Sequence, residues 1–259
     1  MQKECEKFSE SSILEGMTSI RALLKAIKEK NPTNDRRIEK ILYNCEKLSE
    51  QDPTVRFLMH RSRELGFELV ASSAKTIDEL TLGASHGGII AVCSQRSIPS
   101  LTAENIKQNG FYCMIQGIED PYNFGYSIRS LYACGCDGII LPERNWLSAA
   151  GVVARSSAGA SELFPIYNSD ALAAADIFHQ KGYTIVCADE RTDNVLGECT
   201  LEYPLLLIVG GEKRGISKEL LNKTDVLVKI DYAREFRASL SAASATTMFA
   251  YEIMRQNKG

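Results

Sequence analysis

The stretch GGEKRGIS, residues 210–217, follows the apolar run PLLLIV and is the strongest clue to the fold. It nearly matches the nucleotide-binding P-loop, G-x-x-x-x-G-K-[ST], whose glycine backbone and lysine hold phosphates. The spacing and Ser217 agree, but Ile216 stands at the lysine position and Glu212 would repel phosphate. An ATP- or GTP-dependent enzyme is therefore disfavoured. Two interpretations remain: a glycine turn against a flat, neutral group such as adenine or ribose, or a plain strand-to-helix turn capped by Ser217.

Composition indicates a globular protein. The chain has 259 residues, enough for two domains. Its residues are 44% hydrophobic and 24% charged. The net charge of −3 creates no general basic field. RNA binding needs only a local positive face, so the charge excludes little. The N-terminus lacks a signal-peptide core, and no apolar run is long enough to cross a membrane. Eight cysteines without a C-x-x-C pair suggest reduced thiols and the cytosol, and three dispersed histidines predict no metal site.

Residues 13–97 are predicted to form a small α/β unit. Helical apolar spacing occurs in residues 19–30 and 53–66, and strands are expected at 67–73 and 87–95. Basic residues gather in this part, including Arg36 and Arg37, either as solvated helix faces or as an RNA-binding surface. The polar connection SIPSLTAENIKQNG, residues 97–110, suggests a boundary between domains 1–104 and 105–259.

The second domain alternates strands and helices, the pattern of a parallel sheet. Strands are expected at residues 111–118, 137–142, 183–189, 204–211 and 225–230, with a last helix from about Ser239 to Asn257. Ligands of such sheets bind beyond the carboxyl ends of the strands. Three segments follow strand ends and should therefore converge on one site: DPYNFGYSIRS at 120–130, GGEKRGIS at 210–217 and DYAREFRASLS at 231–241.

The first and third segments offer both structural and chemical roles. Asn123 could cap a helix, and Arg129 could clamp a phosphate, assist deprotonation of an alcohol, or simply pack on the surface. Ser239 or Ser241 could cap the last helix, where small residues allow another backbone to approach.

Taken in order, the three segments resemble the motifs of the SpoU (TrmH-type) family of RNA ribose 2′-O-methyltransferases. The matching positions are Asn123, Gly125 and Arg129, then Gly210, Glu212 and Gly215, then Ser239, Leu240 and Ser241. The resemblance spans residues 108–257 and includes RSSAGASE, with Arg155 and Glu162, between the first two motifs. It implies a trefoil-knotted, parallel-sheet α/β methyltransferase domain. More loosely, TIDELTLGASHGGIIAV resembles the end of a ribosomal-protein-like RNA-binding domain fused ahead of such enzymes.

The resemblance also implies an activity and a set of roles. The enzyme would transfer methyl from S-adenosylmethionine to a ribose 2′-hydroxyl, with ribosomal RNA favoured over transfer RNA, in a cytoplasmic homodimer contacting through the last helix. The implied catalytic residues are Arg129, which takes the proton, with Asn123, Glu212 and Ser239. The implied cofactor contacts are Gly210, Gly215, Ile230, Leu240 and Ser241. The basic residues Arg36, Arg37 and Arg155 are expected to contact RNA.

Two positions depart from the family pattern. Ser241 replaces an asparagine, and Asp231-Tyr232 stands where a Pro-Met pair is common. Loss of the asparagine removes an amide that both donates and accepts hydrogen bonds. A non-catalytic RNA-binding paralogue of the same fold therefore remains the main alternative, and base methylation remains open beside ribose methylation.

Overall fold

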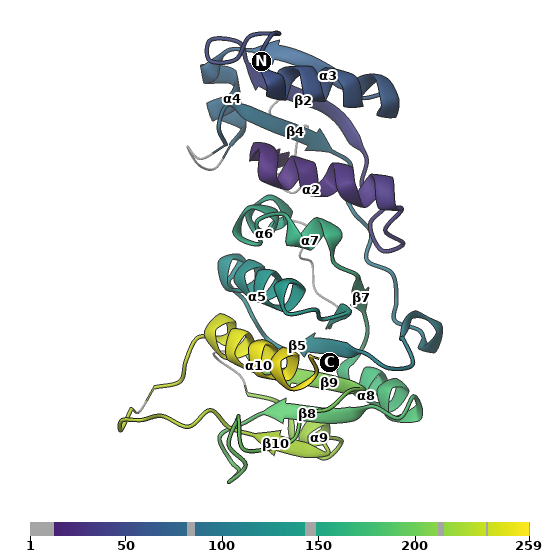
Figure 1. Ribbon diagram of the computed structural model, residues 1–259, viewed down its shortest axis with the longest axis vertical. Coiled ribbons are helices and arrows are strands. Elements are labelled where there is room, and N and C mark those ends of the chain that lie inside the picture. Colours follow the sequence, from purple (N-terminus) through teal and green to yellow (C-terminus); the bar gives the residue numbers. More distant parts are fainter. Residues whose placement is uncertain (1–12, 82–85, 143–148, 212–214, 237, 259) are drawn as a thin grey trace. The chain divides into compact units, whose positions relative to one another are not determined.

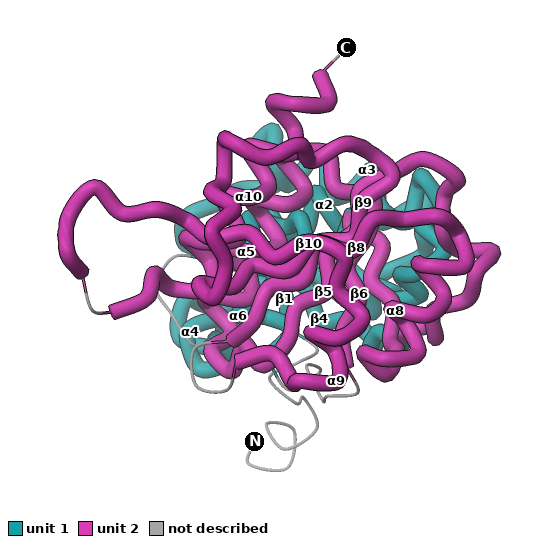
Figure 2. The backbone as a smooth tube through the Cα atoms, turned by 90° about the horizontal axis from the view of Figure 1, so that it is seen from below, with its two compact units in different colours: residues 1–97, 145–163 teal, residues 98–144, 164–259 magenta. Residues whose placement is uncertain are grey.

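The computed structural model describes residues 13–81, 86–142, 149–211, 215–236 and 238–258. The chain divides into two compact units (Figure 2). Unit 1 combines residues 1–97 with residues 145–163, and unit 2 combines residues 98–144 with residues 164–259. The first change of unit lies at the start of the predicted connection 97–110, whereas the return of residues 145–163 to unit 1 has no counterpart in the sequence-based division at residue 104.

Unit 1 is built on a four-stranded mixed sheet in the order β1-β4-β2-β3 (Figure 1). β2 pairs in parallel with β3, whereas β4 pairs antiparallel with both β1 and β2. The elements of unit 1 are β1 Ile13–Glu15, α2 Gly16–Glu29, β2 Ile38–Asn44, α3 Pro53–Leu65, β3 Glu68–Ser72, α4 Ala74–Leu80, β4 Ile89–Cys93, α6 Ala150–Ser156 and α7 Ala160–Leu163.

Alternation along the sheet sorts the core of unit 1 into two layers. On β4, Ile89 and Ala91 join the cluster formed with α2 and α3, while Ile90 and Val92 join Ile77 of α4 in the other. Successive strand residues point to opposite faces, so a continuously buried strand supplies both layers. This explains why β4 is apolar throughout and buried along its whole length.

Helices α6 and α7 pack within unit 1, although their sequence lies inside the predicted methyltransferase domain. Ala154 of α6 joins the core cluster that contains residues of α2 and α3. Gly159 has φ +82, and a Cβ there would lie 2.5 Å from Ala22 Cβ and 3.1 Å from Thr18 O of α2. Only glycine fits such a position.

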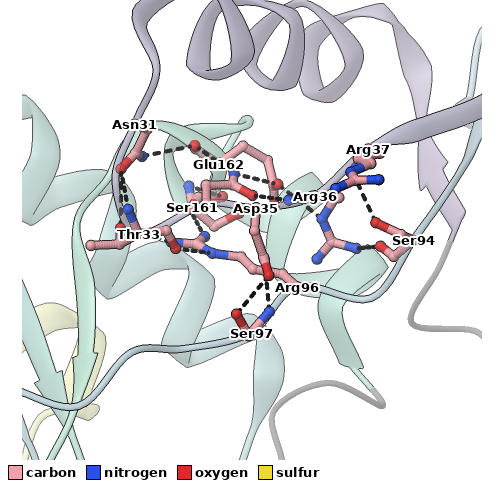
Figure 3. Close-up of polar contacts among 12 residues, drawn as sticks. Asn31, Thr33, Asp35, Arg36, Arg37, Ser94, Arg96, Ser97, Ser161 and Glu162 are labelled. Atoms are coloured by element: carbon pink, nitrogen blue, oxygen red, sulfur yellow. Dashed lines mark hydrogen bonds and ion pairs between the residues drawn. The ribbon is translucent and has the colours of Figure 1, made fainter.

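A buried polar cluster completes this packing (Figure 3). The Arg36 Nε and Glu162 Oε2 atoms are 3.1 Å apart, and both side chains are 2% exposed. Asn34 Nδ2 donates to the same Oε2 at 3.0 Å, and Arg96 Nη1 donates to Ser161 O at 2.7 Å. Buried charges need such partners, so the cluster joins segments more than a hundred residues apart through specific bonds.

Unit 2 contains the predicted parallel sheet. Its six strands lie in the order β10-β8-β9-β5-β6-β7, and every neighbouring pair is parallel. The elements of unit 2 are η2 Ala103–Asn105, β5 Phe111–Ile115, α5 Pro121–Ala133, β6 Gly138–Leu141, β7 Ile166–Asn168, α8 Ala171–Gln180, β8 Thr184–Ala188, β9 Leu205–Val209, α9 Lys218–Leu221, β10 Val226–Val228 and α10 Ala242–Gln256.

The helices of unit 2 bring the site segments into position. α8 and α9 contribute Phe178 and Leu220 to the core cluster with alternate residues of β5, β8 and β9. α5 and α10 pack against each other and lie side by side in Figures 1 and 2, and Ser130 Oγ and Thr247 Oγ1 lie 2.7 Å apart. The first motif segment therefore lies on α5, and the third motif segment leads directly into the adjacent helix α10.

Two expectations about the chain environment can be compared with the structure. Seven of the eight cysteines fall in the described residues, where all seven are free and four are buried. Most of the seven described thiols are therefore buried. Within the described residues, every helix is too short or too polar to cross a membrane.

Candidate active site

A pocket of about 410 Å³ lies in unit 2 where β8, β9 and β10 end. This is the edge of a parallel sheet at which ligands usually bind. Its walls come from the ends of the three strands, the glycine turn, the loop that follows β10 and the start of α10. The lining residues are Ala188, Asp189, Glu190, Val209, Gly210, Gly211, Gly215, Ile216, Val228, Lys229, Ile230, Tyr232, Ser239, Leu240, Ala242, Ala245 and Phe249.

The glycine turn after β9 forms one wall through its backbone. A Cβ on Gly211 would lie 2.1 Å from Gly117 O, so the turn passes directly against the loop after β5. Ser217 caps α9 by accepting a hydrogen bond from Leu220 N at 3.2 Å. The predicted cap is confirmed, and Gly210 and Gly215 both line the pocket. Glu212 lies outside the described residues.

The third segment, together with Ile230 directly before it, forms another wall. Ile230, Ser239 and Leu240 line the pocket, and the Tyr232 hydroxyl accepts a hydrogen bond from Leu240 N at 3.3 Å. Ser241 caps α10 by accepting from Ser244 N at 3.2 Å, and it is absent from the described lining. The last helix therefore starts at Ala242, three residues later than predicted.

The first segment lies on α5 beside these walls. Asp120 caps this helix, with its side chain accepting from Tyr122 N, and Pro121 occupies the first turn. The interpretation of Asn123 as the cap is therefore wrong, because the helix begins before it. Neither Asn123 nor Arg129 is among the described residues that line the pocket, and Arg129 is exposed on α5. Of the three segments expected to converge, GGEKRGIS and DYAREFRASLS contribute residues to the pocket lining. The segment DPYNFGYSIRS instead lies on α5, which packs against α10.

One carboxylate of the pocket lining, that of Asp189, was not predicted from the sequence. Asp189 follows β8, and its side chain is 10% exposed. Arg191 Nε donates to Asp189 Oδ1 at 2.9 Å and Arg191 Nη2 to Asp189 Oδ2 at 2.6 Å. Hydrogen bonds from the Arg191 side chain lower the pKa of the Asp189 carboxyl, so it stays ionised at neutral pH. The sequence signal that could have indicated Asp189 is an acidic residue directly after a buried strand.

The three arginines predicted to bind RNA have different environments. Arg36 is buried against Glu162 and also donates to Ser94 O at 3.0 Å, so we withdraw it as an RNA contact. Arg155 Nη1 is 2.9 Å from Glu15 Oε2, and its side chain is 25% exposed. Arg37 is exposed, and its backbone N–H donates to Ser94 Oγ. Arg37 is therefore the most accessible of the three.

No group of three potential metal ligands gathers among the residues that the structure describes. The pocket offers instead glycine backbone, apolar walls and two carboxylates, Asp189 and Glu190, with the ammonium of Lys229 nearby. Such a lining suits a nucleoside-sized ligand that carries positive charge and several hydrogen-bond donors.

Comparison with known proteins places this site in a family. Residues 110–251 match the model of the SpoU rRNA methylase family. The chain is 27% identical over 215 residues to the 23S rRNA (guanosine-2′-O-)-methyltransferase RlmB of Shewanella oneidensis, covering 80% of this chain and 86% of that protein. It is 25% identical to the RlmB of Photorhabdus laumondii, covering 95% and 98%. An AdoMet-bound rRNA methyltransferase from Sinorhizobium meliloti shares the fold, with a TM-score of 0.77, 21% identity and coverage of 95% and 88%.

Proposed function

Because the chain belongs to the SpoU rRNA methylase family, we propose that it transfers a methyl group from S-adenosylmethionine to a ribose 2′-hydroxyl of ribosomal RNA. The observation that carries this proposal is the pocket, whose walls contain five motif or neighbouring residues: Gly210, Gly215, Ile230, Ser239 and Leu240. Family membership also implies the trefoil knot, which is rare among protein folds.

The pocket fits the proposed cofactor in size and chemistry. Its volume of about 410 Å³ lies within the range of small-molecule sites. Glycine backbone at Gly210 and Gly211 allows a flat ring to approach closely, and Ile230 and Leu240 add apolar walls. The ionised carboxylate of Asp189 suits the cofactor's hydroxyls and its positive charges.

The reaction needs positioning and removal of one proton. When bound, S-adenosylmethionine supplies an electrophilic methyl group on a sulfonium, so the protein need not activate it further. The remaining tasks are to hold the ribose hydroxyl in line and to accept its proton. We assign proton removal to Arg129, which would first lose a proton of its own to the adjacent RNA phosphate and then accept the proton of the ribose hydroxyl. The motifs of the family give supporting polar roles to Asn123, Glu212 and Ser239.

The relatives suggest the finer identity of the substrate. Both RlmB proteins are described as acting on a guanosine of 23S rRNA. The Photorhabdus protein matches almost the whole chain, including the part that forms unit 1. We therefore propose a guanosine of 23S rRNA as the substrate, and the cytoplasm as the place of action, since ribosomal RNA is found there.

A homodimer is supported by one exposed face of unit 2. Tyr122 and Tyr126 of α5 are 42% and 49% exposed, and Met248 and Tyr251 of α10 are 43% and 58% exposed. Large apolar side chains gathered on adjacent helices are typical of protein interfaces. A single-protomer mass in solution would contradict this assignment.

The activity is tested by methyl transfer from labelled S-adenosylmethionine into total RNA from cells that lack this gene. The RNA is digested to nucleosides, and the Arg129→Ala variant serves as control. We expect label in 2′-O-methylguanosine, and its loss in the control. Label in a methylated base would refute ribose methylation. No label and no cofactor binding would favour the non-catalytic RNA-binding paralogue.

A further inference from the structure

Two aromatic side chains stand exposed on the loop between β10 and α10. Tyr232 is 36% exposed and Phe236 is 59% exposed, the largest exposed fraction among the large hydrophobic side chains described. Their ring centroids are 6.0 Å apart and their planes meet at 67°, an edge-to-face pair. The loop extends outward from unit 2 in both Figure 1 and Figure 2. These rings are therefore accessible to a large ligand.

The pair is anchored at the rim of the cofactor pocket. Tyr232 lines the pocket, and its hydroxyl accepts the backbone N–H of Leu240 at 3.3 Å across the loop. Phe236 contacts the Tyr232 ring but is not among the described residues that line the pocket. One ring thus belongs to the wall of the pocket, and the other extends the same surface beyond it.

Exposed single aromatic residues are common, but a contacting pair at the mouth of a pocket is a candidate binding surface. The order Tyr232, Arg234, Phe236 places a basic residue between the two rings, and all three are exposed. Aromatic rings that alternate with guanidinium groups suit single-stranded RNA, since bases stack on the rings and phosphates pair with the cations.

We propose that Phe236, supported edge-on by Tyr232, is a stacking platform for a nucleobase of the RNA substrate beside the methylated ribose. This inference rests on the proposed function for the identity of the substrate. Stacking tolerates any base, because every base has a π-face. The platform would therefore add affinity and hold the nucleotide at the pocket mouth, while other contacts select the sequence.

The cofactor is a weaker candidate for the same ring. A ligand enclosed by the pocket contacts its lining, and that lining includes Tyr232 but, among described residues, not Phe236. Removal of the Phe236 ring should therefore affect RNA and leave the cofactor largely unchanged. This separation makes the proposal testable.

The test measures KM for RNA, kcat and the affinity for S-adenosylhomocysteine in the full-length protein. The Phe236→Ala variant should raise KM for unmodified, transcribed 23S rRNA by about tenfold, the effect of losing one stacked base. Its kcat and its affinity for S-adenosylhomocysteine, measured by calorimetry, should stay within about twofold. Phe236→Trp should keep KM close to the wild-type value. Phe236→Leu should raise KM as Phe236→Ala does, because leucine keeps apolar area without a π-face.

Tyr132→Ala is the matched control. Tyr132 is 38% exposed on α5 and pairs edge-on with Phe164 at 5.7 Å, away from the pocket lining. Its removal should leave KM for RNA unchanged. An unchanged KM in Phe236→Ala, or full rescue by leucine, would overturn the proposal. So would an equal loss of S-adenosylhomocysteine affinity, or a change in molecular mass showing that the ring contacts a second copy. If the wild-type protein transfers no methyl group, the proposed function is rejected. The RNA affinities of the wild type and of Phe236→Ala would then be compared by filter retention, which still tests the stacking platform.

Discussion

The buried cluster around Glu162 in unit 1 and the pocket of unit 2 use charge in opposite ways. In the cluster, the Arg36 and Glu162 side chains are 2% exposed and bound to each other. At the pocket, Asp189 is paired with Arg191, whose side chain is 60% exposed. A buried pair whose hydrogen bonds are formed within the protein holds segments together. A charge that lines a pocket can still meet a ligand.

The role of an arginine in this protein depends on its surroundings. Arg36 and Arg129 both stand among residues expected to be functional, yet Arg36 is buried and Arg129 is exposed on α5. A guanidinium stays protonated in nearly every environment, so charge alone does not distinguish the two. Their difference should appear as loss of stability in one variant and loss of activity in the other.

The largest expected effect is on the activity of Arg129→Ala. We expect kcat for methyl transfer to fall by at least about 100-fold, the usual contribution of a positioned acid–base group. The midpoint of thermal unfolding should change little, because the side chain is exposed. Single-turnover rates and a melting curve measure the two quantities. A variant with near wild-type kcat would remove Arg129 from the mechanism.

Glu162→Gln should have the largest effect on stability. The change leaves the Arg36 charge buried without its counter-charge, which costs about 3 kcal/mol in the free energy of unfolding. Urea unfolding of the variant measures this loss.

The double variant Arg36→Met/Glu162→Gln separates the ion pair from simple packing. Because it removes the uncompensated charge, it should be more stable than Glu162→Gln alone. The single variant Arg36→Met is measured beside it. If the double variant loses the sum of the two single losses, the two side chains are not energetically coupled.

The strand–helix order could be predicted from the sequence because each element carries a local signal. Buried runs such as 205–209 and the amphipathic spacing of 53–65 depend on neighbours in the chain. The all-parallel sheet in unit 2 and the Ser217 cap followed from the same local information. The convergence of GGEKRGIS and DYAREFRASLS on one pocket followed from strand polarity alone.

The features that escaped prediction depend on distant residues. Arg36 finds its partner 126 residues away, so its burial left no trace in the local pattern of basic residues. The return of residues 145–163 to unit 1 depends in the same way on the fit of Gly159 against α2. The prediction of Asn123 as a cap was wrong because Asp120 precedes a proline at the first helical position, and this pair starts the helix three residues earlier.

Asp189→Asn should have an intermediate effect, confined to the pocket. Loss of the charge should weaken S-adenosylhomocysteine binding by about tenfold if the carboxylate meets ligand donors. Arg191 lowers the pKa of Asp189 in the folded protein, so the charge persists at neutral pH and is lost only when pH falls through that lowered value. The difference between variant and wild type should therefore be constant from about pH 5 to pH 8.

Calorimetry across that pH range measures the effect, with Asp176→Asn as the control. Asp176 also pairs with a cation, Lys223, but lies on α8 and outside the described pocket lining. A loss of affinity that grows as pH falls through 6 would assign the effect to another titrating group. Equal losses in both variants would indicate general destabilisation.

The smallest expected effect is that of Ser241→Ala, and it decides between two roles. As the cap of α10, the Ser241 hydroxyl accepts one backbone N–H, and its removal should cost about 1 kcal/mol in the free energy of unfolding. Ser217→Ala removes an equivalent hydrogen bond from α9. It therefore shows how much the loss of a helix cap alone changes stability and ligand affinity. If Ser241 also binds the cofactor, its variant should lose S-adenosylhomocysteine affinity beyond that of Ser217→Ala. Equal affinities in the two variants would leave Ser241 as a structural residue, because a helix cap stabilises α10 without touching the ligand.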